Sequence, residues 1–301
     1  MTVSLDWRAA GFIDLPMGVC NAQAVLLGEK VYMGGGDTTH GPTSDTLFIY
    51  DCTKRSWDQL DTPTQWYALT VYHGQLVLVG GVDPVNNSAT KQLWTLDNGW
   101  WTQTLPPMLT ERFRVSAVST GDHLIVAGGD MGGESGVQDT VEVYDGQQQQ
   151  WKKVQSLPKP CSWTKTAVHD GNWYLAGGEG QDGEVFYASL EHLTTTTYSK
   201  GDGQTSVWKT LPAPMSLKYS TPIAIREQLI CVGGQSDGSD SSSSSAIFSY
   251  NFHTKTWADV GTLPAACHST CALALPNEEL LITEGMTERG MSSRVFRAKI
   301  E

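Results

Sequence analysis

Hydrophobic and polar residues alternate with a period of two in short runs along the chain. Between Leu105 and Val154 this alternation predicts four strands, at Val115–Ser119, His123–Ala127, Thr140–Tyr144 and Trp151–Val154. The pair Gly128–Gly129 ends the second strand, and Asp145–Gly146 supplies a tight turn between the third and the fourth. A twisted sheet of four such short strands cannot bury both of its faces alone, so we expect it to stack against similar sheets.

Glycine pairs of this kind recur at nearly regular intervals. They are Gly35–Gly36, Gly80–Gly81, Gly128–Gly129, Gly177–Gly178 and Gly233–Gly234, with Glu284–Gly285 as a degenerate sixth mark. The second glycines are separated by 45, 48, 49, 56 and 51 residues. A tryptophan follows most of the pairs, at Trp57, Trp101, Trp151, Trp208 and Trp257. The chain is therefore built from repeats that each predict one four-stranded sheet.

Repeats of about 50 residues with four strands and a double glycine resemble the kelch family of β-propellers. The resemblance covers nearly the whole chain and implies an all-β fold, a single domain over residues 1–301 with six blades of four antiparallel strands. Trp7 precedes the first glycine pair, and after Gly285 the chain supplies one more strand, Arg294–Ala298. We therefore expect the strand around Leu5–Arg8 to complete the sixth blade, which removes exposed sheet edges.

Several conspicuous residues have a structural explanation. A tryptophan at a fixed place in each repeat is expected to fill the gap between adjacent sheets. The glycine pairs follow strands and precede no helix, so they indicate backbone geometry rather than phosphate binding. The six cysteines lie mostly in or beside predicted strands, where cysteine is usually a small buried side chain. Cys267 and Cys271 have no accompanying cluster of ligands, and we predict no metal and no cofactor.

Charge and composition narrow the choice of partners. The formal net charge of -12 argues against nucleic-acid and anionic-membrane binding, which need clustered lysine and arginine. It weakly favours a basic or neutral partner. We expect neither a signal peptide nor a membrane span, so a reducing, cytoplasmic setting and a monomer are the default expectations.

Alignment of the six copies on their second glycine brings equivalent residues to the mouth of the central channel, where the innermost strands begin. Fifteen residues before that glycine lie Asn21, Trp66, Arg114, Trp163, Tyr219 and Thr270. Two positions earlier lie Val19, Thr64, Arg112, Cys161, Leu217 and His268. Trp, Tyr and Arg dominate the energetics of protein interfaces. We therefore predict a partner-binding ring of Asn21, Trp66, Arg112, Arg114, Trp163, Tyr219 and His268, with packing between blades as the alternative role for its aromatic residues.

Acidic residues follow the glycine pairs. They are Asp37, Asp45, Asp83, Asp130, Glu134, Asp139, Glu179, Asp182, Asp237, Asp240 and Glu288. An acidic rim around the mouth would favour basic segments of a partner, mainly by steering their approach. Ordinary polar loops on an acidic protein explain the same pattern equally well.

Kelch propellers commonly bind peptide segments of partner proteins at this mouth, so the resemblance implies a non-catalytic protein- or peptide-binding module. The alternative is a carbohydrate-binding or sugar-modifying propeller, epimerase-like or mutarotase-like, with Glu134 and either Arg114 or His268 as an acid/base pair. The predicted strands leave only His40 and His268 at the mouth, too few for a copper oxidase site. Catalysis is therefore less expected than binding.

Overall fold

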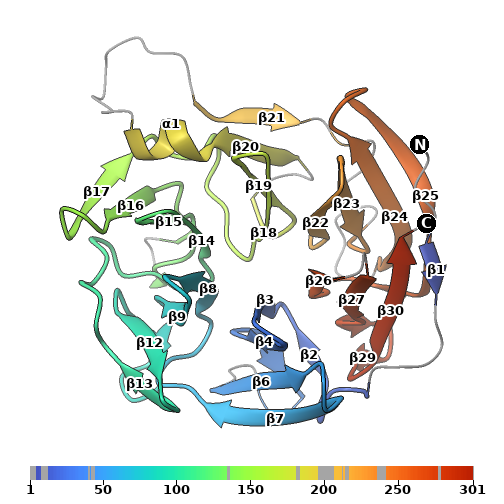
Figure 1. Ribbon diagram of the computed structural model, residues 1–301, viewed down its shortest axis with the longest axis horizontal. Helices are drawn as coiled ribbons and strands as arrows, with labels where there is room; N and C mark the ends of the chain where they lie inside the picture. Colours follow the sequence, from blue (N-terminus) through green and yellow to red (C-terminus); the bar gives the residue numbers. More distant parts are fainter. Residues whose placement is uncertain are drawn as a thin grey trace.

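The computed structural model describes residues 5–7, 13–39, 41, 45–133, 136–180, 184–195, 207–211, 213, 217–235, 242–276 and 279–300. In this part of the chain, six four-stranded antiparallel sheets stand in a ring around a central channel (Figure 1). The ring confirms the predicted all-β, six-bladed propeller. In each blade the strand next to the channel comes first in the repeat, and the next three strands follow outward.

Short hydrophobic strands make up each blade. Blade one contains β3 (Gln23–Leu27), β4 (Lys30–Gly34), β6 (Thr46–Asp51) and β7 (Ser56–Asp61), and blade two contains β8 (Ala68–Tyr72), β9 (Gln75–Val79), β12 (Leu93–Asp97) and β13 (Trp100–Thr102). Blade three contains β14 (Ser116–Thr120), β15 (His123–Ala127), β16 (Val141–Asp145) and β17 (Gln150–Val154), and blade four contains β18 (Lys165–His169), β19 (Asn172–Ala176), β20 (Val185–Ser189) and β21 (Lys209–Leu211). Blade five contains β22 (Thr221–Ile225), β23 (Gln228–Val232), β24 (Ser244–Asn251) and β25 (Thr256–Cys267), and blade six contains β26 (Ala272–Leu275), β27 (Glu279–Thr283), β30 (Val295–Ile300) and β1 (Leu5–Trp7).

Three additional two-stranded pairs involve the connections between the second and third strands of a blade. They are β2 (Val19–Cys20) with β5 (Asp37–Thr38), β10 (Val82–Asp83) with β11 (Ser88–Ala89), and β28 (Met286–Thr287) with β29 (Gly290–Met291). The pairs β10–β11 and β28–β29 lie wholly within such a connection, whereas β2 belongs to the segment that enters blade one. These connections share one face of the ring with the starts of the innermost strands. We call that end of the channel the mouth, and the opposite face, with the hairpins between first and second strands, the hairpin face.

The two ends of the described chain close the ring. Strand β1 pairs antiparallel with β30, so that Leu5 lies opposite Ile300 and Trp7 opposite Ala298. Trp7 meets Phe296 edge to face, with ring centroids 6.2 Å apart. In Figure 1, β1 lies beside β30 although the two come from opposite ends of the sequence. The prediction that the N-terminal strand completes blade six is confirmed.

The repeated tryptophans connect each blade to the segment arriving from the previous one. The indole N–H groups of Trp57, Trp101, Trp151 and Trp208 donate to the backbone carbonyls of Ile13, Asp61, Pro106 and Gln155, at 2.7, 2.8, 2.8 and 3.1 Å respectively. Rings also pack on third-strand aromatics, as between Tyr144 and Trp151 with centroids 5.4 Å apart. This confirms the packing role predicted for these tryptophans.

The second glycine of each pair lies against the start of the innermost strand. Gly81 has φ of +113°, and a Cβ placed there would lie 2.3 Å from Thr64 Oγ1 and 2.5 Å from the Gln65 carbonyl oxygen. Any larger residue would have to displace backbone, which explains the glycine at this position of the repeat.

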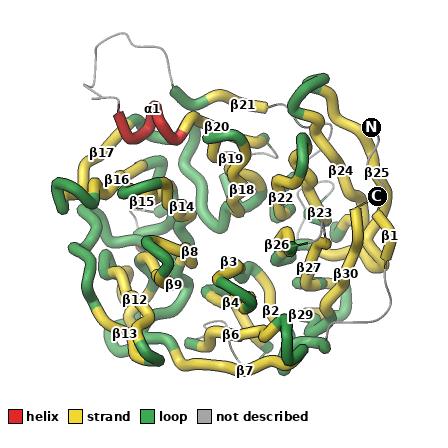
Figure 2. Tube along the Cα trace, in the orientation of Figure 1, coloured by secondary structure: helices red, strands yellow, loops and turns green. Residues whose placement is uncertain are grey.

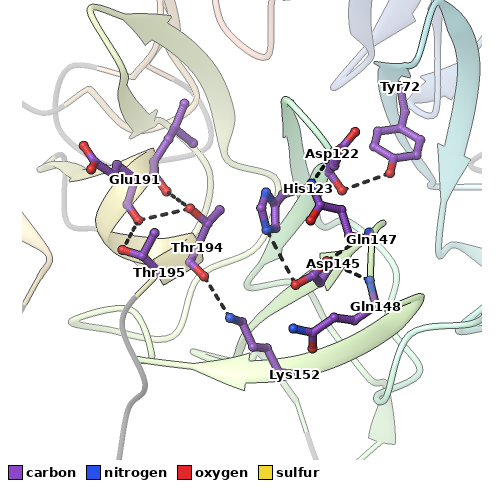
Figure 3. A network of polar contacts seen from close by, with 11 residues as sticks. Tyr72, Asp122, His123, Asp145, Gln147, Gln148, Lys152, Glu191, Thr194 and Thr195 are labelled. Atoms are coloured by element: carbon purple, nitrogen blue, oxygen red, sulfur yellow. Dashed lines mark hydrogen bonds and ion pairs between the residues drawn. The ribbon is translucent and has the colours of Figure 1, made fainter.

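The sequence pattern missed one helix. Helix α1 (Leu190–Thr195) follows β20, where only a long connection was predicted; residues 196–206 of that connection lie outside the described residues. Leu190 and Leu193 are buried in a cluster shared with blade three. Figure 3 shows Lys152 of β17 donating from Nζ to the Thr194 carbonyl oxygen at 2.8 Å. The helix therefore joins blade four to blade three.

A polar network joins blade two to blade three on the hairpin face. The Tyr72 hydroxyl donates to the Asp122 carbonyl oxygen at 3.0 Å, and the Gln147 side-chain amide donates to an Asp122 carboxylate oxygen at 3.0 Å (Figure 3). Asp145 accepts from the backbone N–H groups of Gln147 and Gln148. The Tyr72 bond thus joins the two blades, the Gln147 side-chain bond links the two hairpins of blade three, and the Asp145 bonds lie within the second of these hairpins.

Five of the six cysteines are buried and none forms a disulfide. Burial raises the pKa of the Cys161, Cys231 and Cys267 thiols to about 12. These thiols are therefore neutral at physiological pH and pack as small apolar groups, as their positions in the sequence indicated.

Candidate functional site

A ring of left-handed residues surrounds the channel mouth. Asn21, Trp66, Arg114, Trp163 and Tyr219 have φ between 50° and 59°, a range uncommon for residues other than glycine. Their backbones are joined from blade to blade, because the Arg114 N–H donates to the Trp66 carbonyl at 2.8 Å and the Trp163 N–H to the Arg114 carbonyl at 3.0 Å. The predicted alignment therefore selected residues that do share one backbone position around the mouth.

In blade six this position belongs to Ser269, and the prediction of Thr270 is wrong. Ser269 has φ of 54°, donates to the Tyr219 carbonyl at 2.9 Å and accepts from the Asn21 N–H at 2.9 Å. Thr270 is fully buried. The cause is the first hairpin of blade six: Leu275 pairs with Glu279, which leaves three connecting residues where the other blades leave two. The extra residue shifts an alignment made on Gly285 by one position.

The same shift changes the position assigned to His268. It forms an isolated bridge with Met286, as Phe113 does with Asp130 and Lys218 with Gln235. His268 therefore lies one residue before the left-handed ring rather than two, half-buried at the mouth. Its Nδ1 lies 3.0 Å from the Ser243 hydroxyl.

Arg112 lies in the interior between blades two and three, so the structure does not support its predicted contact with a partner. Its side chain is 0% exposed, and Nη2 lies 3.3 Å from a carboxylate oxygen of Glu142, which is equally buried. Nη1 donates to the carbonyls of Gly128 and Thr140 at 2.9 and 2.7 Å. Burial lowers the pKa of the Arg112 guanidinium, and Glu142 opposes that effect. Val19, Thr64, Cys161 and Leu217, at the same repeat position, are also buried.

Arg114 is held at the mouth by an aromatic cage. Its guanidinium carbon lies 4.4 Å from the ring centroid of Trp66, 5.0 Å from that of Phe113 and 4.9 Å from that of Trp163. Asp130 lies 3.8 Å from Nη1. Cation–π contacts are worth about 0.5–2 kcal/mol each, so the cage fixes the arginine in place. The two tryptophan rings therefore contact Arg114, and Trp163 is only 7% exposed.

Tyr219 and Asn21 contribute polar groups to the rest of the mouth. The Tyr219 hydroxyl donates to Glu179 at 2.6 Å. Asp37 accepts from the Asn21 side-chain amide at 3.3 Å and from the Trp66 indole at 2.8 Å. These bonds connect blades one and two, and blades four and five, across the mouth surface.

An open pocket of about 790 Å³ lies between these groups and the Arg114 cage. Its lining includes Asn21, Arg114, Trp163, Tyr219 and His268, so the structure brings five of the seven predicted site residues into one pocket. Trp66 is adjacent, through its ring contact with Arg114.

Two residues that line this pocket each carry a buried oxygen atom without a partner in the described structure. The Asn21 Oδ1 and Gln235 Oε1 atoms are buried and accept no hydrogen bond within the described part of the chain. Both residues line the pocket. A buried acceptor without a donor costs about 1–3 kcal/mol, which a ligand N–H group would offset once a side-chain rotation turned the oxygen toward the pocket.

Acidic side chains dominate the charge of this pocket. Asp37, Glu179 and Glu288 line it. Among the described lining residues Arg114 is the sole lysine or arginine, and its guanidinium already faces Asp130. The predicted rim residues Glu134, Asp182, Asp237 and Asp240, and His40, lie outside the described residues.

Sequence alignment missed Phe113, Gln235 and Ser243. Phe113 and Gln235 lie at the bridge positions beside the left-handed ring, which the alignment skipped. The repeat could have identified both residues. Phe113 lies one residue before the aligned Arg114, and Gln235 lies one residue after the second glycine, Gly234.

Lys165 closes the channel beneath the mouth. Its Nζ crosses from β18 in blade four to blade one, where it donates to the carbonyls of Asn21 and, at 2.6 Å, Ala22. Blades four and one face each other across the ring (Figure 2). Burial lowers the pKa of Lys165 to about 8, although Cys271, Cys20 and Asp37 act in the opposite direction.

The lowered pKa of Lys165 predicts a pH-dependent stability. Below pH 8 the amine is charged in both the folded and the unfolded chain. Between about pH 8 and 10.5 the unfolded chain holds the proton and the folded protein has lost it, so the free energy of unfolding gains up to about 1.4 kcal/mol per pH unit from this group. Urea titrations at several pH values should show that the free energy of unfolding of wild type rises relative to that of Lys165→Met over this range. Lys255→Met, at the surface, is the control and should show no such difference. A constant difference between wild type and Lys165→Met would contradict the prediction.

The one helix among the described residues is α1, which has six residues and is too short to span a membrane. Within the same residues no group of three or more His, Cys, Asp or Glu side chains is placed to hold a metal ion.

Comparison with known proteins agrees with the fold. The family model of the KLHDC2/KLHL20/DRC7 Kelch-repeats domain matches residues 21–212, well over half of the chain. The chain belongs to the kelch-repeat family.

Three similar proteins are much longer than the matched region. Beta-scruin of Limulus polyphemus is 28% identical over 164 residues, which cover 49% of this chain and 18% of that protein. Kelch-like protein 41b of Danio rerio is 27% identical over 118 residues, 38% of this chain and 19% of that protein. Kelch-like protein 40 of Xenopus tropicalis is 30% identical over 198 residues, 62% of this chain and 31% of that protein. The chain spans less than a third of each of these relatives.

Proposed function

We propose that this kelch propeller is a protein-interaction module whose channel mouth binds a linear peptide segment of a partner protein. The kelch-like relatives support a role in protein interaction in general. The observation that carries the proposal for the mouth is the pocket of about 790 Å³ with its two unpaired acceptor oxygens, on Asn21 and Gln235. A peptide offers backbone N–H groups at regular spacing, which is the chemistry that these oxygens lack.

The charge of the pocket favours a peptide with a basic residue. Asp37 and Glu179 are both fixed by hydrogen bonds to neighbouring side chains, so their carboxylates are preorganised. Glu288 adds a third negative charge. Such a surface steers lysine or arginine toward the mouth and disfavours acidic segments. The Arg114 cage supplies a rigid wall beside them.

The carbohydrate alternative gains no comparable support. Sugar binding by stacking needs exposed aromatic faces, but the faces of Trp66 and Trp163 contact the Arg114 guanidinium. We therefore retain peptide binding as the proposed function.

The proposal is tested with peptides selected from a random linear library on the wild-type protein. Replacing both Trp66 and Arg114 by alanine removes the wall and should weaken the selected peptides at least tenfold. Glu179→Gln keeps the acceptor for Tyr219 and removes one charge, so it should weaken basic peptides severalfold and neutral ones little. Affinities are measured by fluorescence polarisation, and folding is checked by thermal unfolding.

The control is Glu227→Gln, an equally conservative change on the hairpin face, where the Glu227 side chain is 72% exposed. It should leave every affinity unchanged. If the folded double variant binds the peptides as tightly as wild type, the mouth is not the binding site.

A further inference from the structure

The channel below the mouth contains a second cavity, separate from the proposed peptide site. It has a volume of about 410 Å³ and is lined by the innermost strands of all six blades. At the mouth end several of these strands begin with buried residues, such as Ser116, Lys165 and Thr221. At the other end Val168 is 45% exposed. The cavity is therefore blind beneath the mouth and open on the hairpin face.

Hydrogen bonds among blades one, two and three, and between blades five and six, form the blind end. Gln23 donates to the Val115 carbonyl at 2.9 Å and accepts from the Leu69 N–H at 3.2 Å. The hydroxyls of Thr221 and Thr270 lie 2.9 Å apart. These neutral groups satisfy one another and leave no group directed toward a ligand.

Lys165 differs from the other residues of the blind end because it is charged. Among the described residues that line the cavity, it is the sole lysine, arginine, aspartate or glutamate. The walls below it are mainly apolar, with Ala24, Leu26, Ile223 and Leu273 among them. An ammonium group has three N–H donors, and the structure assigns two of them, to the carbonyls of Asn21 and Ala22.

The charge of Lys165 has no carboxylate bonded to it in the described structure. Asp37 acts on it only from the mouth side, where its oxygens accept from Asn21 and Trp66. Two carbonyl dipoles compensate a buried ammonium less well than a bonded anion does. An anionic head group at the blind end, followed by an apolar chain, would match both the charge and the walls of the cavity.

We propose that the channel binds a linear monocarboxylate of medium chain length, which enters from the hairpin face and pairs its carboxylate with Lys165. The apolar tail then lies along the six innermost strands. Five-residue strands such as β18 rise about 3.3 Å per residue, so the channel is deep enough for an extended chain of eight carbons. This binding is independent of the proposed peptide site.

The test compares octanoate with octanol and octylamine, by isothermal titration and thermal unfolding of the full chain. Wild type should bind octanoate at least tenfold more tightly than octanol and should not bind octylamine. Lys165→Met preserves length and apolar packing but removes the charge, so octanoate should lose its advantage over octanol. Equal binding of octanoate and octanol by wild type, or no binding of octanoate, would overturn the proposal.

A second variant covers the case in which Lys165→Met fails to fold. Val168→Trp narrows the open end and leaves Lys165 intact, so it should block octanoate. Alanine at Val168 is the matched control and should bind octanoate as wild type does. Val168→Trp and Val168→Ala should both retain the peptide affinity of the mouth. Failure of this proposal and failure of the proposed function therefore give different results. Unchanged octanoate binding by Val168→Trp would place the ligand outside the channel.

Discussion

Replacing Arg112 by methionine should destabilise the propeller by about 3–5 kcal/mol, because it leaves the Glu142 carboxylate buried without its counter-charge. Both side chains are 0% exposed and lie between blades two and three. The Gly128 and Thr140 carbonyls lose their donors in the same variant. Urea denaturation followed by tryptophan fluorescence measures the change in the free energy of unfolding.

Two further variants separate charge burial from simple loss of contact. Adding Glu142→Gln to Arg112→Met removes the unpaired charge and keeps an acceptor for the Leu109 N–H, so it should restore a large part of the stability. Lys54→Met breaks the exposed pair with Asp51 and should cost less than about 1 kcal/mol. If Arg112→Met is no more harmful than Lys54→Met, the buried pair does not have the assigned role.

Removing residues 1–8 should destabilise the protein severely and promote association. Blade six then loses β1, including the packing of Leu5 and Trp7 on the cluster of blades five and six. Complete burial of two such side chains is worth about 3–6 kcal/mol together, and Leu5 and Trp7 are half-buried, so their packing contributes roughly half of that. The exposed edge of β30 would also become free to pair with other chains. Scanning calorimetry and light scattering measure the two effects.

A synthetic peptide of residues 1–12 provides the control for this truncation. Added to the truncated protein, it should restore the unfolding midpoint in a concentration-dependent manner, whereas the same peptide with Leu5→Asp and Trp7→Asp should not. A truncated protein as stable and monodisperse as wild type would show that β1 does not close the ring.

Periodic features of the sequence were sufficient to predict the ring. The spacing of the glycine pairs gave the number of blades, and the position of Trp7 before the first pair indicated how the last blade closes. These predictions succeed because each copy repeats one backbone geometry, which glycine and tryptophan report independently of tertiary context. The left-handed ring from Asn21 to Tyr219 follows from the same spacing.

Other features depend on contacts that the repeat pattern does not encode. The burial of Arg112 depends on Glu142, which lies 30 positions later in β16 of the same repeat and has no counterpart implied by the other copies. The shift from Thr270 to Ser269 comes from one extra residue in a hairpin, which a glycine mark at Gly285 cannot reveal. Likewise, Trp66 and Trp163 could be aligned from the sequence, but their contact with Arg114 could not.

The most direct test of the central claim, that the mouth binds the partner, is amide hydrogen exchange of the protein with and without a selected peptide. The account predicts protection at the mouth, around Asn21, Arg114, Tyr219, Gln235 and His268, and unchanged exchange at the hairpins containing His73, Asp122 and Glu227. Protection confined to those hairpins, with none at the mouth, would contradict it.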